Sequence, residues 1–203
     1  IGGRKMTIFL DDMSMPEVNN WGDQPTLELV RQIIETKGYY FLDKDLRGLR
    51  LNLENINYIA AMNHPGGGRN DIPSRLKRHF FTFNITPPSE ESIDMIYGSM
   101  LRGMYEDNET LSTQVSKITT ATIQLWKQMK KRMLPTPAKF HYIFNMRDLS
   151  RIFQGILNCP INVLKQSNAN LFYLWYHECE RVLCDKLVNA KDKHFYHQEA
   201  QTI

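Results

Sequence analysis

The amino-acid sequence predicts an α/β part followed by an all-helical part. Two apolar runs typical of buried strands lie before residue 86, and beyond it apolar residues recur at helical spacing. Between the two parts, Thr86-Pro87-Pro88-Ser89 interrupts any regular structure. We therefore expect two domains, residues 1–86 and 87–203. A hydrophobic fraction of 42% and a charged fraction of 23% fit globular folding and argue against disorder.

The expected elements of residues 1–86 are short strands, one helix and loops. The helix begins at Thr26 as its capping residue, ends near Lys37 and is stopped by Gly38. The remaining elements are a strand Met6–Leu10, a hairpin of Tyr39–Leu42 with Leu49–Leu53, a strand Ile56–Met62, a basic segment Ser74–His79 and a strand Phe80–Ile85.

The second part should be helical throughout. Helices are expected near residues 89–104, 110–133, 147–157 and 169–188, and Pro135-Thr136-Pro137 separates the second from the third. The last of these helices carries an apolar face at helical spacing, made of Leu171, Leu174, Trp175, Cys179, Val182 and Leu183.

Charge and cysteine content limit the class of protein. Residues 1–86 carry 11 basic and 10 acidic side chains, and residues 87–203 carry 14 and 12, so no basic cluster indicates a nucleic-acid partner. No apolar run is long enough for a membrane-spanning helix. The three cysteines form no CxxC pair, which indicates a reducing, cytoplasmic compartment and argues against a zinc site. The start at Ile1, without a Met, suggests a piece of a longer chain.

Two acidic residues at a strand end are the first candidates for chemistry. Asp11 and Asp12 follow the strand Met6–Leu10, and in nucleotide hydrolases such a pair places one carboxylate toward Mg²⁺ and the other toward the attacking water. The alternative is that two aspartates simply begin a loop. Asn63 follows the next strand and could orient water or contact a terminal phosphate; alternatively, it starts a turn.

Glycines and arginines supply the remaining candidates. Gly66-Gly67-Gly68-Arg69 could cradle phosphate, but GxxxxGK[ST] is absent from these residues, which favours a turn beside the site. Arg75 or Arg78 could stabilise charge on a transferred phosphoryl group, or belong to a solvated helix face. Arg147 could reach bound phosphates from a lid, or pair with Asp148 or Asp94.

The order and the amino-acid sequences of these segments resemble the third AAA+ module of axonemal dynein heavy chains, most closely those of the outer-arm type. The similar segments are Phe9–Pro16, Trp21–Pro25, Ala60–Asn70 and Leu134–Ser150, and the resemblance covers nearly the whole chain. It implies part of an AAA+ P-loop NTPase large subdomain, without its Walker A portion, in residues 1–86. Residues 87–203 would then be the helical lid and the start of the connection to the next module.

The resemblance assigns a role to each candidate residue. Asp11 would bind Mg²⁺ at the end of the Walker B strand, and Asp12 would act on the water. Asn63 would be the first sensor and Arg147 the second, and Arg75 or Arg78 the arginine finger. ATP or ADP would be the ligand. AAA+ modules usually carry Glu where Asp12 stands, and the shorter carboxylate of Asp12 indicates slow hydrolysis or a poorly placed water.

The parent protein implied by the resemblance is an ATPase, a minus-end-directed microtubule motor of the ciliary or flagellar axoneme. Its partners would be the neighbouring AAA+ modules, the microtubule, and dynein intermediate and light chains; neither nucleic acid nor membrane is expected. This module would regulate the motor by binding ATP. The alternatives are a non-hydrolysing structural segment of the ring and an AAA+ ATPase of another remodelling class, including a nucleic-acid-dependent one.

Overall fold

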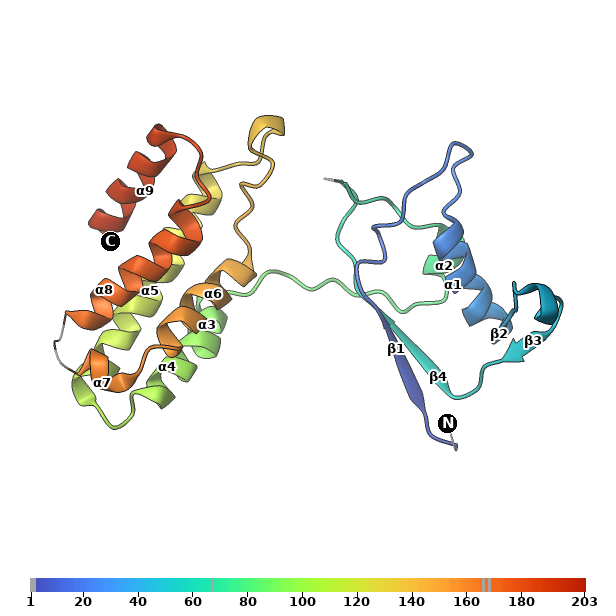
Figure 1. Ribbon diagram of the computed structural model, residues 1–203, viewed down its shortest axis with the longest axis horizontal. Helices are drawn as coiled ribbons and strands as arrows, with labels where there is room; N and C mark the ends of the chain where they lie inside the picture. The colour runs from blue at the N-terminus through green and yellow to red at the C-terminus, as the bar shows by residue number, and fades with distance from the viewer. Residues whose placement is uncertain (1–2, 67, 166, 168) are drawn as a thin grey trace. The chain divides into compact units, whose positions relative to one another are not determined.

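The chain divides into two compact units. The computed structural model describes residues 3–66, 68–165, 167 and 169–203, and separates Ile1–Ile85 from Thr86–Ile203 (Figure 1). The division falls beside the proline pair at positions 87 and 88. Within the described residues, no helix is both long and apolar enough to cross a membrane.

The first unit combines short strands with one longer helix. A 3₁₀ turn, Lys44–Leu46, lies between its second and third strands. The other elements are β1 (Met6–Leu10), α1 (Pro25–Thr36), β2 (Gly38–Tyr40), β3 (Arg50–Asn52), β4 (Ile56–Ala60) and α2 (Ser74–Lys77).

The central feature of this unit is the parallel pairing of β1 with β4. The register pairs Met6 with Ile56 and Leu10 with Ala60, so both strands run in step to the same edge. On one face, Leu10 and Ala60 pack with α1 against a small buried cluster of Met13, Leu27, Ile72 and Leu76.

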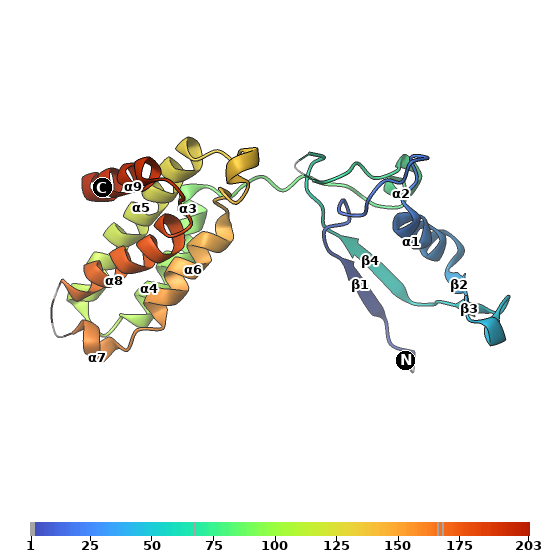
Figure 2. The same ribbon diagram turned by 45° about the horizontal axis from the view of Figure 1, so that its top comes forward.

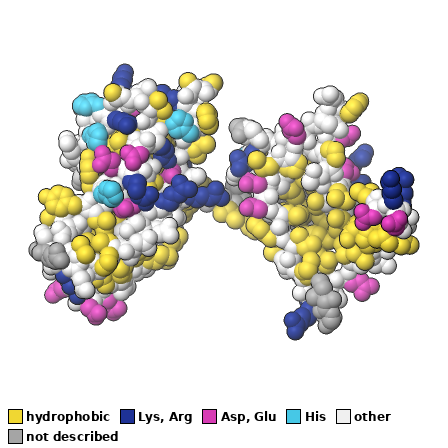
Figure 3. Space-filling model, in the orientation of Figure 1, with side chains coloured by type: hydrophobic (Ala, Val, Ile, Leu, Met, Phe, Trp, Pro, Cys, Tyr) yellow, Lys and Arg dark blue, Asp and Glu magenta, His cyan; other side chains and the backbone are white. Residues whose placement is uncertain are grey.

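The other face of β1 and β4 is uncovered in the described residues. Phe9 and Ile59, which are register partners, are 59% and 54% exposed. Figure 3 shows hydrophobic side chains gathered over this region of the first unit. Because parallel sheets are normally covered on both faces, these exposed side chains mark a sheet that lacks part of its usual packing.

Helix α1 differs at both ends from the prediction. Its N-cap is Gln24 and its first residue is Pro25, not a capping Thr26, because the fixed φ of proline suits the first helical position. The helix ends at Thr36, near the predicted end, and Lys37 rather than Gly38 takes the left-handed capping conformation, with φ 52°. Gly38 is instead the first residue of β2, where a Cβ would collide with the carbonyl oxygen of Leu51.

The predicted hairpin is confirmed and the predicted third strand is wrong. β2 and β3 pair antiparallel, with Tyr39 opposite Leu51. Residues 80–85 form no strand: Phe81 and Phe83 are 91% and 70% exposed, and no described strand lies alongside to accept their hydrogen bonds. β-propensity alone does not form a strand without a partner. The strand predicted to reach Met62 also ends earlier, at Ala60.

The second unit is a helical bundle, as predicted. The first expected helix is α3 (Glu90–Ile93), a π-helical turn (Asp94–Gly98) and α4 (Ser99–Met104) in succession. The other elements are α5 (Glu109–Arg132), a 3₁₀ turn (Pro137–Lys139), α6 (Met146–Leu157), α7 (Ile161–Leu164), α8 (Asn170–Cys179), a π-helical turn (Glu180–Cys184) and α9 (Ala190–Thr202).

Helix α5 runs through the core of the bundle, with α6 and α8 beside it (Figures 1 and 2). Its buried side includes Leu125 and Met129, which are fully enclosed. The indole Nε1 of Trp175 on α8 donates to Thr122 Oγ1 on α5 over 2.8 Å, which satisfies a buried polar group on each helix. The Tyr97 and Phe153 rings stack at 4.7 Å and join the π-helical turn Asp94–Gly98 to α6.

The C-terminal helix was not predicted. The helix expected over 169–188 ends at Cys184, and α9 follows at Ala190. The apolar face of the expected helix is buried except at Leu174, which is partly buried. Tyr196 and Ala200 are the buried residues of α9, and the helix shows almost no apolar periodicity for a sequence argument to use.

Helices α6 and α8 approach each other closely at Gly155. A Cβ at this position would overlap the carboxylate of Glu178, which is buried and receives two hydrogen bonds from Arg181, from Nε over 3.0 Å and from Nη2 over 2.5 Å. The absence of a side chain at Gly155 is therefore what lets the two helices pack here.

We expect Gly155→Ala to destabilise the chain by about 1–3 kcal/mol, the usual cost of overpacking a close contact. The measurement is urea unfolding of the purified chain. Gly103→Ala on α4 is the matched control: its Cβ would meet nothing within 4 Å, so this substitution should be neutral or stabilise by up to about 1 kcal/mol. Equal effects of the two substitutions would contradict this account of the α6–α8 contact.

Candidate functional site

The candidate residues of the first unit lie where β1 and β4 end. Ala61 N donates to Leu10 O over 2.9 Å and Met13 N donates to Ala61 O over 3.0 Å, so the chains stay paired just past the strands. Asp11 and Asp12 leave β1 at this edge, and Asn63 follows β4 at the same edge. In parallel α/β sheets this is the edge at which ligands bind.

The two aspartates have different surroundings. Asp11 is exposed; its Oδ1 accepts the Asp12 backbone N–H over 3.0 Å, and it forms no ion pair with a described residue. Asp12 adopts φ 47° and its Oδ1 accepts a hydrogen bond from Arg69 Nη2 over 3.0 Å. The Asp11 carboxylate is thus open to a cation, whereas the Asp12 carboxylate is partly neutralised by an arginine.

The glycine-rich loop positions this arginine. Gly66 N donates to Arg69 O over 2.9 Å and Arg69 N donates to Gly66 O over 3.2 Å, which closes a tight turn. Gly66 and Gly68 have φ values of 125° and 84°, a region that favours glycine; Gly67 lies outside the described residues. Because two of the loop's N–H groups bond within the turn, the loop acts here as a support for Arg69.

The loops on either side are tied together by polar contacts. Asn70 N donates to Ser14 O over 2.8 Å, and Pro16 O accepts from both Asn70 Nδ2 and Gln24 Nε2. Asn63 lies in the exposed stretch between β4 and this anchored segment. Sequence reasoning missed the Arg69–Asp12 pair, because the residues are far apart in the chain and only the strand pairing brings them together.

The basic segment after the loop forms α2, held by buried Leu76. Arg78 Nη2 pairs with Glu35 on α1 at 2.5 Å, and Lys77 Nζ pairs with Asp71 at 2.6 Å. The hydrogen bond from Lys77, with that from the Ile72 N–H, lowers the pKa of Asp71. Arg75 is exposed and pairs with no described residue, so α2 presents one arginine that is engaged and one that is not.

In the second unit, Arg147 lies in the first turn of α6. Its backbone N–H donates to Asn145 Oδ1 over 3.0 Å, and the Asp148 carboxylate accepts from Asn145 N over 3.0 Å, which completes a capping box. The Arg147 side chain is exposed. Its alternative partners are taken: Asp148 pairs with Lys186 at 3.1 Å, and Asp94 pairs with Arg102 at 3.3 Å.

Lys186, which follows the π-helical turn Glu180–Cys184, fixes the start of α6. Its Nζ contacts the buried carboxylate of Asp148, lies 4.3 Å from the centre of the Phe144 ring and donates to Ile143 O over 3.2 Å. These contacts hold the backbone on which Arg147 is mounted.

We expect Lys186→Met to destabilise the chain by about 2–4 kcal/mol, because it leaves the buried Asp148 carboxylate without its cation. The change in unfolding free energy can be measured with urea. Lys127→Met is the comparison: Lys127 also pairs with a carboxylate, that of Glu90, but both side chains are about half exposed. Its loss should cost less than about 1 kcal/mol. A small effect at both positions would mean that Asp148 does not need Lys186.

Comparison with known proteins follows the same division. Residues 1–88 match the family model of the P-loop containing dynein motor region, and residues 118–202 match that of the AAA+ lid domain. The chain is 49% identical over 194 residues to Dynein axonemal heavy chain 5 of Rattus norvegicus, and this alignment covers 94% of this chain and 6% of that protein.

Two further dynein heavy chains are similar to this chain over most of its length. The chain is 47% identical over 199 residues to Dynein axonemal heavy chain 8 of Homo sapiens, covering 96% of this chain and 4% of that protein. It is 43% identical over 211 residues to Dynein gamma chain, flagellar outer arm, of Chlamydomonas reinhardtii, with 96% and 5% covered. The chain thus spans only 4 to 6% of the length of these relatives.

Proposed function

This chain belongs to the family of axonemal dynein heavy chains, and on that premise we propose that it forms part of the third AAA+ module of an outer-arm heavy chain. The parent protein is then an ATP-driven, minus-end-directed microtubule motor of the ciliary or flagellar axoneme. The module binds ATP and thereby regulates the motor, and its direct partners are the neighbouring modules of the same chain.

The state of the sheet supports a role inside a larger assembly. The described part of the sheet has only β1 and β4, and the Phe9 and Ile59 side chains stand exposed on its uncovered face. A two-stranded parallel sheet is marginal by itself. Further strands and helices of the parent module would cover these side chains and supply the phosphate-binding loop.

The observation that carries the proposal is the shared edge on which Asp11, Asp12 and Asn63 follow their strands. The exposed carboxylate of Asp11 is an oxygen ligand of the kind Mg²⁺ prefers. When bound, Mg²⁺ neutralises charge on the phosphates. Asp12 accepts a hydrogen bond from the attacking water, and Asn63 orients that water.

The contact between Arg69 and Asp12 favours slow hydrolysis at this site. Its contact with the Asp12 carboxylate competes with the water that Asp12 is proposed to polarise. Asp12 is also one methylene shorter than a Glu. Both features fit a module that hydrolyses its nucleotide slowly, and they favour regulation over rapid hydrolysis.

Arg75 and Arg78 differ in whether an ion pair engages the side chain. Arg78 is engaged by Glu35 within its own unit, whereas Arg75 is exposed. Arg75 is therefore the better candidate for stabilising charge on a phosphoryl group held by a neighbouring module. Arg147 remains the predicted phosphate sensor of the helical unit, since its side chain is exposed.

In the intact motor, Asp12→Asn should lower ATP hydrolysis at this module by about 10²-fold or more while leaving nucleotide affinity within a factor of a few, because the amide cannot accept the proton. Single-turnover hydrolysis and binding of a fluorescent ATP analogue separate the two effects. Unchanged hydrolysis would leave the non-hydrolysing ring segment as the better account.

Arg75→Ala should slow ATP hydrolysis at the neighbouring module by about 10³-fold, the lower end of the range for an arginine finger. Arg78→Ala is its matched control and should leave hydrolysis near the wild-type rate, because Arg78 serves an ion pair with Glu35. Reversal of the two results would assign the finger to Arg78.

A further inference from the structure

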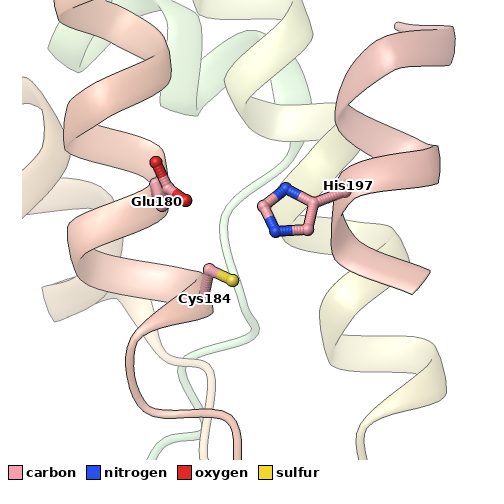
Figure 4. Close-up of side chains that lie close together, drawn as sticks. All are labelled: Glu180, Cys184 and His197. Atoms are coloured by element: carbon pink, nitrogen blue, oxygen red, sulfur yellow. The ribbon is translucent and has the colours of Figure 1, made fainter. Parts of the chain in front are cut away.

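Three side chains with metal-binding atoms converge in the second unit, on elements that carry none of the candidate residues of the proposed nucleotide site. Glu180 and Cys184 lie on the π-helical turn that follows α8, and His197 lies on α9 (Figure 4). One ligand atom from each lies within 4.8 Å of the others. Cys184 is buried, and Glu180 and His197 are half-buried.

The secondary structure accounts for this convergence. Glu180 and Cys184 are four residues apart, which places both side chains on one side of the helical turn. Figure 4 shows the imidazole of His197 turning its two nitrogens toward them from the facing helix. Single π-helical turns are rare and occur frequently at functional sites.

The imidazole is also oriented as in a metal centre. Tyr176 Oη lies 2.9 Å from His197 Nδ1, and this hydrogen bond fixes the ring and commits one nitrogen. Nε2 is then the nitrogen left for a ligand. Metal-bound histidines nearly always hold their second nitrogen in such a hydrogen bond.

A second observation at the same place indicates a missing ligand. The hydroxyl of Tyr196, on α9 beside His197, is fully buried and has no hydrogen-bond partner among the described residues. Tyr196 directly precedes His197, and the centres of their two rings lie 5.3 Å apart. An unpaired buried hydroxyl is costly, and a water held by a metal would satisfy it.

We propose that Glu180, Cys184 and His197 form a binding site for Zn²⁺ or a similar divalent transition metal, with a water as fourth ligand. Thiolate, imidazole and carboxylate are the ligands that Zn²⁺ takes in proteins. A thiolate, a carboxylate and a neutral imidazole together balance the charge of the dication. The bound metal joins α9 to the turn after α8.

Binding requires the thiol to lose its proton. A cysteine thiol without a metal is protonated at neutral pH. Formation of the S–Zn bond replaces the S–H bond, and the proton passes to solvent, so metal uptake should release about one proton per chain.

This inference revises the prediction from cysteine spacing. The sequence lacks a CxxC pair, and the three potential ligands on the α8 segment (His177, Cys179 and Cys184) do not share a face. The structure instead draws its ligands from two helices, and α9 was not predicted at all. Helix α9 buries two residues and is joined to the rest of the bundle by polar contacts of Asp192 with Lys139 and Tyr142, and a metal would add a further connection.

The test uses the purified 203-residue chain, stripped with EDTA and then titrated with Co²⁺ and with Zn²⁺ against a chromophoric chelator. We expect one equivalent of metal per chain and a thiolate-to-cobalt charge-transfer band. Cys184→Ser and His197→Gln should each weaken Zn²⁺ binding by at least about 10-fold, and Tyr176→Phe by about 10–100-fold. Cys159→Ser and the exposed His194→Gln are the matched controls and should bind as the wild type does.

Absence of the charge-transfer band in the wild-type chain would overturn the proposal. So would Zn²⁺ affinity that survives both Cys184→Ser and His197→Gln, or that falls equally in the Cys159 and His194 controls. Should Cys184→Ser fail to fold, the wild-type cobalt spectrum and the Tyr176→Phe affinity still decide the question.

Discussion

The parallel alignment of β1 with β4 is the constraint on which the first unit depends. The strands are separated by more than forty residues of chain, and their in-step register brings both carboxyl ends to one edge. A shift of β4 by one residue would turn Ala60 away from the buried cluster and expose it. The same shift would move Asp11 relative to Asn63, so the packing of the sheet and the position of the polar groups are set together.

In the second unit, too, a packing contact fixes the position of a candidate residue, at the start of α6. Arg147 is exposed, but the residue after it is buried: Asp148 caps α6 and accepts the ammonium of Lys186. The buried pair determines where the helix begins and therefore where the arginine emerges. In the first unit, exposed Arg75 likewise precedes a buried residue, Leu76. In both cases the buried neighbour fixes the backbone position from which the exposed arginine side chain extends.

The sequence was informative where a local signal exists. The two paired strands, the hairpin, the proline boundary and the helix carrying Arg147 follow from apolar runs, turn residues and capping. It failed where tertiary contacts decide: Phe81 and Phe83 look like strand residues but have no partner strand, and α9 has too few apolar positions to be noticed. The Arg69–Asp12 pair and the Glu180–Cys184–His197 cluster could not be read from spacing, because each joins elements that only the fold brings together.

The open sheet has a practical consequence for handling this chain. Within the described residues, β1 and β4 pair only with each other, so the outer side of each strand presents backbone N–H and C=O groups to solvent beside exposed apolar side chains. Such an edge can recruit a strand from another copy. Recombinant chains should therefore self-associate as concentration rises, and a charged residue in place of Phe9 or Ile59 is the most direct way to keep them dispersed.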